Sequence, residues 1–235
     1  MPPTPGNTDV VILCGGMGTR LQSVLNDRPK PLAEINHRPF LKILVDYVAN
    51  FGFRRFILCS GYRGNQIKDY FASLNDDRTY ILSNEDSPLG TAGALKKAEN
   101  LIQGENFLAL NGDSYCEVPL DDLLQYHSSH RAVATLALTH VEEAGDYGGI
   151  AINEEGEILA FQEKVKNSKP DWINAGVYLF QTSLLKSIAP DQKVSLEFET
   201  FPSLIGKGLY GFTTQRPLYD IGTPERLELA RKHLT

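Results

Sequence analysis

A glycine-rich loop and a lysine between two prolines are the residues of this sequence best suited to bind phosphates. The loop Gly15-Gly16-Met17-Gly18-Thr19-Arg20 follows an apolar, β-branched run at residues 10–14. Glycines let the backbone approach a ligand closely and turn its N–H groups toward an anion. Lys30 lies in Pro29-Lys30-Pro31, which the two prolines hold extended. Arg20 and Lys30 are therefore candidates to neutralise the β- and γ-phosphates of a nucleotide. The alternative is a tight turn that binds nothing.

Two other phosphate-binding loops do not fit this pattern. A Walker A loop requires Gly-Lys followed by Ser or Thr, and the sequence has no such triplet here. The dinucleotide fingerprint requires a third small residue where this chain has Leu21, and an acid after the second strand, where it has Ser60-Gly61. An NAD-linked oxidoreductase is therefore a weak alternative.

Six motifs, in order along essentially the whole chain, resemble the sugar nucleotidyltransferase family. The resemblance is specific because of this order, since each motif alone is weak to moderate. Within the family, the chain is most similar to the short branch that forms GDP-heptose, whose members also share a Ser-x-Glu helix start, here Ser195-Leu196-Glu197. Cys14 departs from the family, in which alanine is commoner at this place. The motifs are the glycine loop with Pro29-Lys30-Pro31, residues 85–95 with Pro88-Leu89-Gly90-Thr91-Ala92-Gly93, Asn111-Gly112-Asp113, Glu163-Lys164, Asn174-Ala175-Gly176-Val177-Tyr178, and Asp220-Ile221-Gly222-Thr223-Pro224.

The resemblance implies a nucleotide site in the first half of the chain. Gly90 and Gly93 are expected to let the base and ribose approach the backbone. Glu85 stands where thymidylyl relatives carry glutamine, and a carboxylate can accept from guanine N1–H and N2–H₂ together, which favours GTP as donor. For Glu85 alone, a solvated loop acid is the alternative. The implied nucleotide-binding residues are Leu13, Gly15, Gly16, Gly18, Thr19, Arg20, Lys30, Glu85, Pro88, Gly90, Thr91, Gly93, Asn111 and Gly112.

Two aspartates are the candidate metal ligands. Asp113 follows the apolar strand at residues 107–110, and Asp220 follows residues 218–219. Carboxylates at neighbouring strand ends can hold Mg²⁺, which the resemblance implies as cofactor. A lone aspartate in such a place is more often a turn or cap residue.

The resemblance also implies a sugar-phosphate site in the second half, in which the glutamate binds sugar hydroxyls and the lysine binds the sugar phosphate. Its residues are Tyr147, Gly148, Gly149, Glu163, Lys164 and Asn174. Without the resemblance, Glu163-Lys164 would be interpreted as a solvated charge pair on an edge strand. The implied catalytic set is Arg20, Lys30, Asp113, Lys164 and Asp220.

The implied reaction is attack by a sugar 1-phosphate on the α-phosphorus of an NTP, giving a nucleotide sugar and pyrophosphate. GMP transfer from GTP to D-glycero-α-D-manno-heptose 1-phosphate is favoured, and mannose 1-phosphate or another sugar 1-phosphate is the alternative acceptor. A module of the same fold that senses a nucleotide sugar without turnover is a further alternative, which the presence of Arg20, Lys30 and both aspartates disfavours.

Alternating elements predict the fold that positions these residues. Strands at residues 10–14, 54–60, 79–84 and 106–111 alternate with helices at 40–51, 65–74 and 91–102, as in βαβ units with a mostly parallel sheet. Later segments at 149–153, 157–162, 174–181, 209–215 and 218–221 predict a smaller antiparallel sheet on the acceptor side. We expect one α/β, Rossmann-like (GT-A-like) domain over residues 1–235, with a nucleotide-binding half at about 9–140 and a sugar-phosphate-binding half at about 141–235, and no C-terminal β-helix.

The composition excludes several partners. The chain has 29 acidic and 23 basic residues, a net charge of −6, and no basic stripe, which argues against nucleic acid. Its apolar runs are too short to cross a membrane, and residues 1–9 do not resemble a signal peptide. Three scattered cysteines suit a reducing cytoplasm. Small-molecule substrates are the expected partners, and a homo-oligomer stays open.

Overall fold

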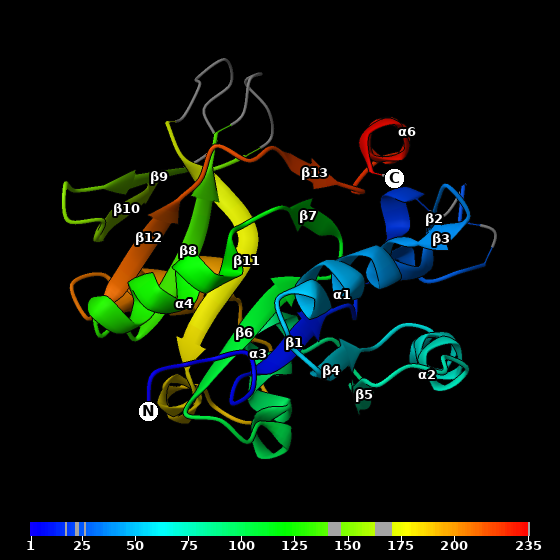
Figure 1. Ribbon diagram of the computed structural model, residues 1–235, viewed down its shortest axis with the longest axis horizontal. Coiled ribbons are helices and arrows are strands. Elements are labelled where there is room, and N and C mark those ends of the chain that lie inside the picture. The colour runs from blue at the N-terminus through cyan, green and yellow to red at the C-terminus, as the bar shows by residue number, and fades with distance from the viewer. Residues whose placement is uncertain (17, 22–23, 26, 141–146, 163–170, 235) are drawn as a thin grey trace.

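The computed structural model describes residues 1–16, 18–21, 24–25, 27–140, 147–162 and 171–234. Helices and strands alternate over the first half of this part of the chain (Figure 1). The helices are α1 (Phe40–Asn50), α2 (Gly64–Ala72), α3 (Gly90–Lys97), α4 (Leu120–Ser129), α5 (Phe201–Leu204) and α6 (Pro224–His233). The strands are β1 (Asp9–Leu13), β2 (Glu34–Ile35), β3 (Arg38–Pro39), β4 (Arg55–Ser60), β5 (Thr79–Asn84), β6 (Asn106–Asn111), β7 (Ser114–Cys116), β8 (Ala134–Thr139), β9 (Gly149–Ile152), β10 (Ile158–Gln162), β11 (Ile173–Gln181), β12 (Leu209–Thr213) and β13 (Leu218–Asp220).

One large sheet runs through the molecule in the order β10-β9-β11-β6-β1-β4-β5, and β8 joins it beside β11, with β12 beside β8. The strands β6, β1, β4 and β5 are parallel, so the α/β fold with a largely parallel central sheet is confirmed. The acceptor-side strands differ from the expected arrangement, because β11 pairs antiparallel with β6 and thereby joins β8, β9 and β12 to the central sheet. The pair β7–β13 forms a separate antiparallel sheet.

Parallel pairing brings the carboxyl ends of three strands to one edge. Leu13 of β1 pairs with Cys59 of β4 on one side and with Asn111 of β6 on the other. Loops that follow these strands therefore start side by side, at the edge where open α/β sheets bind their ligands. The glycine loop and Asp113 both follow strands that end there.

The core has two layers, one on each face of the sheet. Side chains alternate along β1, so that Val10 and Ile12 pack with Phe40 of α1, whereas Val11 packs with Leu95 of α3. All of these side chains are fully buried. Helices on both faces thus fix the parallel strands, and with them the loops at the carboxyl edge.

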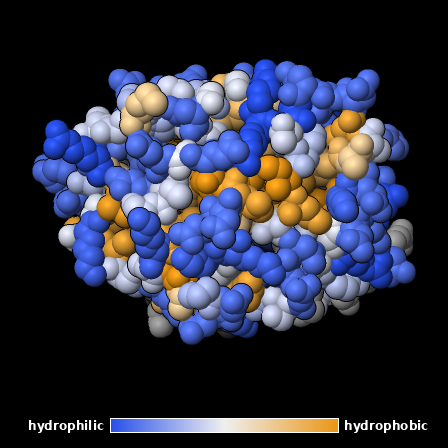
Figure 2. All heavy atoms as spheres, turned by 90° about the horizontal axis from the view of Figure 1, so that it is seen from below, coloured by the Kyte–Doolittle hydropathy of each residue, from blue (hydrophilic) through white to orange (hydrophobic). Residues whose placement is uncertain are grey.

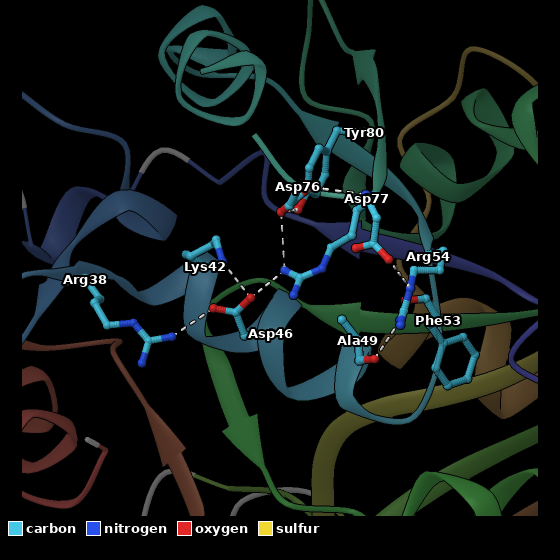
Figure 3. Close-up of polar contacts among 10 residues, drawn as sticks. Arg38, Lys42, Asp46, Ala49, Phe53, Arg54, Asp76, Asp77 and Tyr80 are labelled. Atoms are coloured by element: carbon cyan, nitrogen blue, oxygen red, sulfur yellow. Dashed lines mark hydrogen bonds and ion pairs between the residues drawn. The ribbon is translucent and has the colours of Figure 1, made fainter. Parts of the chain in front are cut away.

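Helix α1 is anchored by a cluster of charges around Asp46. Apolar residues three and four apart bury one face of the helix, and Asp46 lies on the other (Figure 3). Arg38 Nη2 lies 2.8 Å and Lys42 Nζ lies 2.6 Å from its carboxylate, and Arg78 also donates to it. Burial raises the pKa of Asp46, but the hydrogen bonds from Lys42 and Arg78 outweigh it and lower the pKa below its usual value. The cluster ties α1 to β3 and to the start of β5.

Helix α4 carries a histidine into the core. His127 is 3% exposed, with Nδ1 at 2.8 Å from Thr135 Oγ1 and Nε2 at 3.2 Å from Asn106 Oδ1. Burial lowers the pKa of His127 to about 4. The ring is therefore neutral at pH 7 and serves packing at the edge of the sheet away from the glycine loop.

The surface is mixed in polarity. On the face in Figure 2, polar side chains surround apolar ones that gather in a strip across the middle. Over the described residues, none of the helices is both long and apolar enough to cross a membrane.

Candidate active site

A cleft of about 380 Å³ opens at the carboxyl edge of the parallel strands. Most of the predicted nucleotide-binding residues line it, together with several that the sequence did not single out. Its walls are formed by Leu13, Cys14, Gly15, Gly16, Lys30, Pro31, Cys59, Glu85, Pro88, Gly90, Thr91, Ala94, Asn111, Gly112, Asp113, Lys193 and Glu197. The fold therefore brings residues from both halves of the chain to one cavity.

Glu85 is held at one wall of this cleft. Its Oε2 accepts a hydrogen bond of 3.0 Å from the Leu89 N–H. Its Oε1 lies so close to the glycine loop that a Cβ on Gly15 would be 2.6 Å from it, and one on Gly61 would be 2.9 Å away. Burial raises the pKa of Glu85, and the Leu89 N–H opposes that shift. Glycine at both positions thus makes room for a carboxylate rather than only for a ligand.

The loop also fits against the phosphate-binding candidate Lys30. Gly18 has a φ of +59°, and a Cβ there would be 2.9 Å from Lys30 Cβ. The Lys30 side chain is 11% exposed, and its ammonium lies 2.5 Å from Asp113 Oδ2. Lys30 is therefore a preorganised cation at the floor of the cleft. The turn Thr19–Leu21 follows, with Thr19 and Arg20 exposed and outside the cleft lining.

The second aspartate is brought to the first by the pairing of β7 with β13. Asp220 pairs with Ser114, and the Ile221 N–H donates to the Asp113 carbonyl at 3.0 Å. The Asp220 carboxylate accepts from the Tyr147 hydroxyl, and Arg226 Nη1 lies 3.1 Å from its Oδ2.

Arg20 approaches the same carboxylate. A Cβ on Gly222 would be 2.8 Å from Asp220 Oδ1 and 3.6 Å from Arg20 Nη2, so both side chains reach the same backbone position. The site therefore combines two acids with the cations Arg20, Lys30 and Arg226.

This donor set fits a magnesium ion. Mg²⁺ binds oxygen ligands and commonly uses one or two carboxylates together with substrate phosphates. Asp220 ends β13, and Asp113 directly precedes Ser114, the residue of β7 with which Asp220 pairs, so both can supply carboxylates. Among the described residues, no cluster of three or more His, Cys, Asp or Glu side chains is arranged as a complete metal cage. A metal held here would thus depend on substrate oxygens to complete its coordination.

A bulge in β11 positions Asn174. The register with β8 shifts between Asn174 and Tyr178, where Gly176 has a φ of +74°. Asn174 Nδ2 donates to the Tyr178 hydroxyl at 2.9 Å, and Asn111 Nδ2 lies 3.2 Å from the same oxygen. Burial raises the pKa of Tyr178, so it stays a neutral hydroxyl. Tyr178 therefore links a residue of the nucleotide cleft to a predicted sugar-binding residue.

A second cavity, of about 650 Å³, adjoins the cleft on the acceptor side. Three predicted sugar-binding residues line it: Gly148, Gly149 and Asn174. The sequence did not assign a role in this cavity to its aromatic residues, Phe161, Phe198 and Phe201, or to Glu197, which lines both cavities. The remaining lining residues are Ile150, Gln162 and Pro202. Tyr147 contacts Asp220 instead, and Glu163 and Lys164 lie outside the described residues.

The glycines at the start of α3 have a different neighbour from the one expected. A Cβ on Gly90 would be 2.5 Å from the Val194 carbonyl oxygen, and one on Gly93 would be 2.5 Å from that of Gln192. Gly90 still lines the cleft, whereas Gly93 does not. Because glycine has no side chain, the backbone of residues 192–194 can pack directly against the start of α3 at these two positions.

The Ser-x-Glu motif continues this segment. Ser195 caps the π-helical turn Leu196–Thr200 by accepting from the N–H groups of Glu197 and Phe198. Glu197 Oε2 accepts from Thr91 Oγ1 at 2.9 Å and from Ser195 Oγ at 2.8 Å. The motif was the one sequence signal that pointed to Glu197, and the structure shows that it joins the two halves of the chain.

A parallel sheet with a glycine loop, a lysine and paired aspartates at its carboxyl edge is the arrangement of a nucleotidyl transferase. A family model for nucleotidyl transferases matches residues 9–235, so the chain belongs to this family, as its motifs predicted. It is 35% identical to the D-glycero-alpha-D-manno-heptose 1-phosphate guanylyltransferase of Aneurinibacillus thermoaerophilus, over 96% of this chain and 98% of the relative. It is 36% identical to the mannose-1-phosphate guanylyltransferase catalytic subunit beta of Drosophila pseudoobscura pseudoobscura, over 94% of this chain and 61% of that protein. Its structure is similar to the crystal structure of HddC from Yersinia pseudotuberculosis complexed with GMP-PN, with a TM-score of 0.84, 31% identity, and coverage of 97% of this chain and 100% of that one.

Proposed function

We propose that this protein is a sugar-1-phosphate guanylyltransferase that transfers GMP from GTP to D-glycero-α-D-manno-heptose 1-phosphate, giving GDP-heptose and pyrophosphate. Two adjoining cavities that share Glu197, with Lys30 and Asp113 on the wall of one of them, carry the proposal, because the reaction needs two phosphorylated substrates side by side. The heptose 1-phosphate guanylyltransferase relative, which this chain matches over nearly its whole length, supports the choice of substrates. HddC, whose crystal contains GMP-PN, supports a guanine nucleotide.

The reaction is a single in-line displacement at the α-phosphorus. The acceptor phosphate is already anionic at neutral pH, so no covalent enzyme intermediate is needed, and catalysis consists of positioning and charge neutralisation. Lys30 and Arg20 stabilise the departing pyrophosphate, and Lys164 offsets repulsion between the acceptor and donor phosphates. Asp113 and Asp220 would hold Mg²⁺, which would supply Lewis-acid charge neutralisation at the phosphates.

Base selection rests on Glu85 and acceptor selection on the second cavity. Glu85 receives guanine N1–H and N2–H₂, because its Oε1 has no hydrogen-bond donor among the described residues. Asn174, Tyr147, Gly148, Gly149 and Glu163 bind the sugar. Mannose 1-phosphate is the second candidate acceptor, supported by the mannose-1-phosphate guanylyltransferase relative.

We further propose that the chain works in the cytoplasm as one nucleotidyltransferase domain, with residues 9–140 for the nucleotide and 141–235 for the sugar phosphate. Its GDP-sugar would enter lipopolysaccharide or capsule synthesis.

Pyrophosphate release over a matrix of four NTPs and several sugar 1-phosphates tests the proposal. We expect the highest kcat/KM with GTP and the heptose 1-phosphate. Preference for mannose 1-phosphate would change the acceptor only, preference for another NTP would overturn guanylyl transfer, and binding of a nucleotide sugar without any turnover would identify a sensing module.

A further inference from the structure

The backbone on both sides of Lys193 is fixed against the nucleotide half. On one side, the Val194 N–H donates to the Leu89 carbonyl at 2.9 Å, and the Val194 carbonyl accepts from the N–H groups of Ala92 and Gly93 at 3.0 and 3.2 Å. On the other side, the Gln192 carbonyl oxygen lies 2.5 Å from the position that a Cβ on Gly93 would take, so the two backbones are in close contact. Lys193 therefore projects from a clamped segment rather than from a free loop.

Its neighbours place Lys193 at the base end of the cleft. The segment packs on Leu89, whose N–H holds the Glu85 carboxylate. Lys193 and Glu85 both line the cleft, as does Ala94 of α3. The other lysine of the lining, Lys30, is paired with Asp113 and marks the phosphate end. Lys193 itself is exposed, and no side chain or carbonyl within the described residues pairs with its ammonium.

Guanine needs a donor beside the acceptor that Glu85 provides. Its Watson–Crick edge presents N1–H and N2–H₂ as donors and O6 as an acceptor, and lysine is a common partner of guanine O6. A lysine has three donors and no acceptor. Adenine carries an amino group at the place of O6, so an ammonium there would face a donor.

We propose that Lys193 is a specificity-determining residue that donates to guanine O6 and so completes, with Glu85, the recognition of the guanine edge. The inference rests on the proposed guanylyl transfer and names a second reader of the same base. It also explains why a segment of the acceptor half is fastened so tightly to α3.

The test compares kcat/KM and Kd for GTP, ITP and 2-aminopurine riboside triphosphate in the wild type, Lys193→Met and Lys193→Arg. ITP keeps O6 and N1–H and lacks the 2-amino group, whereas 2-aminopurine lacks both O6 and N1–H, so the comparison is of how far its use depends on Lys193 and not of its overall use. Lys193→Met should lose about 10- to 100-fold in kcat/KM with GTP and with ITP, mainly through KM, because hydrogen bonds to charged groups are strong. With 2-aminopurine the loss should vanish. Lys193→Arg should restore part of the activity with GTP, and Lys186→Met, a lysine outside both cavities, is the matched control.

Two results would overturn the proposal, and a third would overturn the proposed guanylyl transfer instead. A loss of the same size with all three nucleotides would mean that Lys193 contacts the phosphates or serves the fold. No loss with GTP would mean that it does not bind the substrate. Failure of the wild type to form GDP-sugar from GTP with any sugar 1-phosphate, while it binds GTP with the predicted Lys193 dependence, would refute the proposed transfer and leave only guanine recognition.

Discussion

Replacing Glu85 with glutamine is the perturbation that probes base selection most sharply. In the structure, Glu85 Oε2 is engaged by the Leu89 N–H at 3.0 Å, and Oε1 lies beside Gly15 and Gly61. Glutamine has one acceptor, so keeping the Leu89 bond turns its amide NH₂ toward the base. That group faces the N1–H and N2–H₂ donors of guanine, while the fold stays unchanged.

The size of the effect follows from the contacts. One carboxylate oxygen is shared with the backbone, so a single charge-assisted hydrogen bond to guanine is the main loss, about 2–3 kcal/mol, or roughly 30- to 150-fold in kcat/KM. Uridine nucleotides present one N–H between two carbonyl oxygens, and one of these oxygens can accept from the new NH₂. The loss with UTP should therefore be smaller, and the ratio of GTP to UTP use should fall.

The assay is pyrophosphate release with GTP and with UTP in the wild type, Glu85→Gln and Asp86→Asn. Asp86 is the adjacent, exposed acid and serves as matched control. An unchanged ratio in Glu85→Gln, or a larger change in Asp86→Asn, would refute the assignment of Glu85 as the base reader.

Four further predictions concern the metal, the leaving group and stability. Asp113→Ala or Asp220→Ala should lower kcat by roughly 10²–10³-fold, and EDTA should abolish activity until Mg²⁺ is added; full activity in EDTA would contradict metal dependence. Arg20→Ala should reduce turnover far more than the affinity for the product GDP-sugar, as measured by calorimetry, and equal losses would point to uniform binding or the fold. In the folded protein the pKa of His127 is about 4, below its usual value of 6.5, so its contribution to stability is present above pH 6.5 and is lost as the pH falls toward 4. Between pH 7 and pH 5, the free energy of unfolding measured in urea should fall by about 2 kcal/mol in the wild type, and a His127→Gln variant should not show this loss. Asp46→Asn removes the carboxylate charge to which three cations donate, and it should lower the free energy of unfolding by about 2 kcal/mol without changing KM. An unchanged midpoint of unfolding in urea would show that the charge cluster does not contribute to stability.

Elements with a strong local pattern were predictable from the sequence. The strands at residues 79–84 and 106–111 have the predicted bounds, and α1 begins at Phe40 as its apolar spacing indicated. Helix α4 was missed although Pro119 and the acids Asp121 and Asp122 mark its start. Strand β8 was missed because it is buried along its whole length and therefore shows no alternation of apolar and polar residues.

The candidate site was predictable only where its residues form motifs. The glycine loop, Lys30 and Asp113 are local signals, and the fold brings them to one cleft. The reason for Gly93 was not predictable, because its partner is the backbone of a residue about a hundred positions away. Lys193 has no motif of its own and becomes significant only through the packing of residues 192–194 on α3. The roles of Glu163 and Lys164 stay predictions.

The fate of the α-phosphorus tests guanylyl transfer most directly. The protein is incubated with [α-³²P]GTP, the heptose 1-phosphate and Mg²⁺, and the products are separated by chromatography while pyrophosphate is measured in parallel. Guanylyl transfer predicts that the label appears in GDP-heptose, with one pyrophosphate released for each GDP-heptose formed and no label on the protein. Label found in free GMP or GDP, or bound covalently to the protein, without formation of GDP-heptose would contradict it.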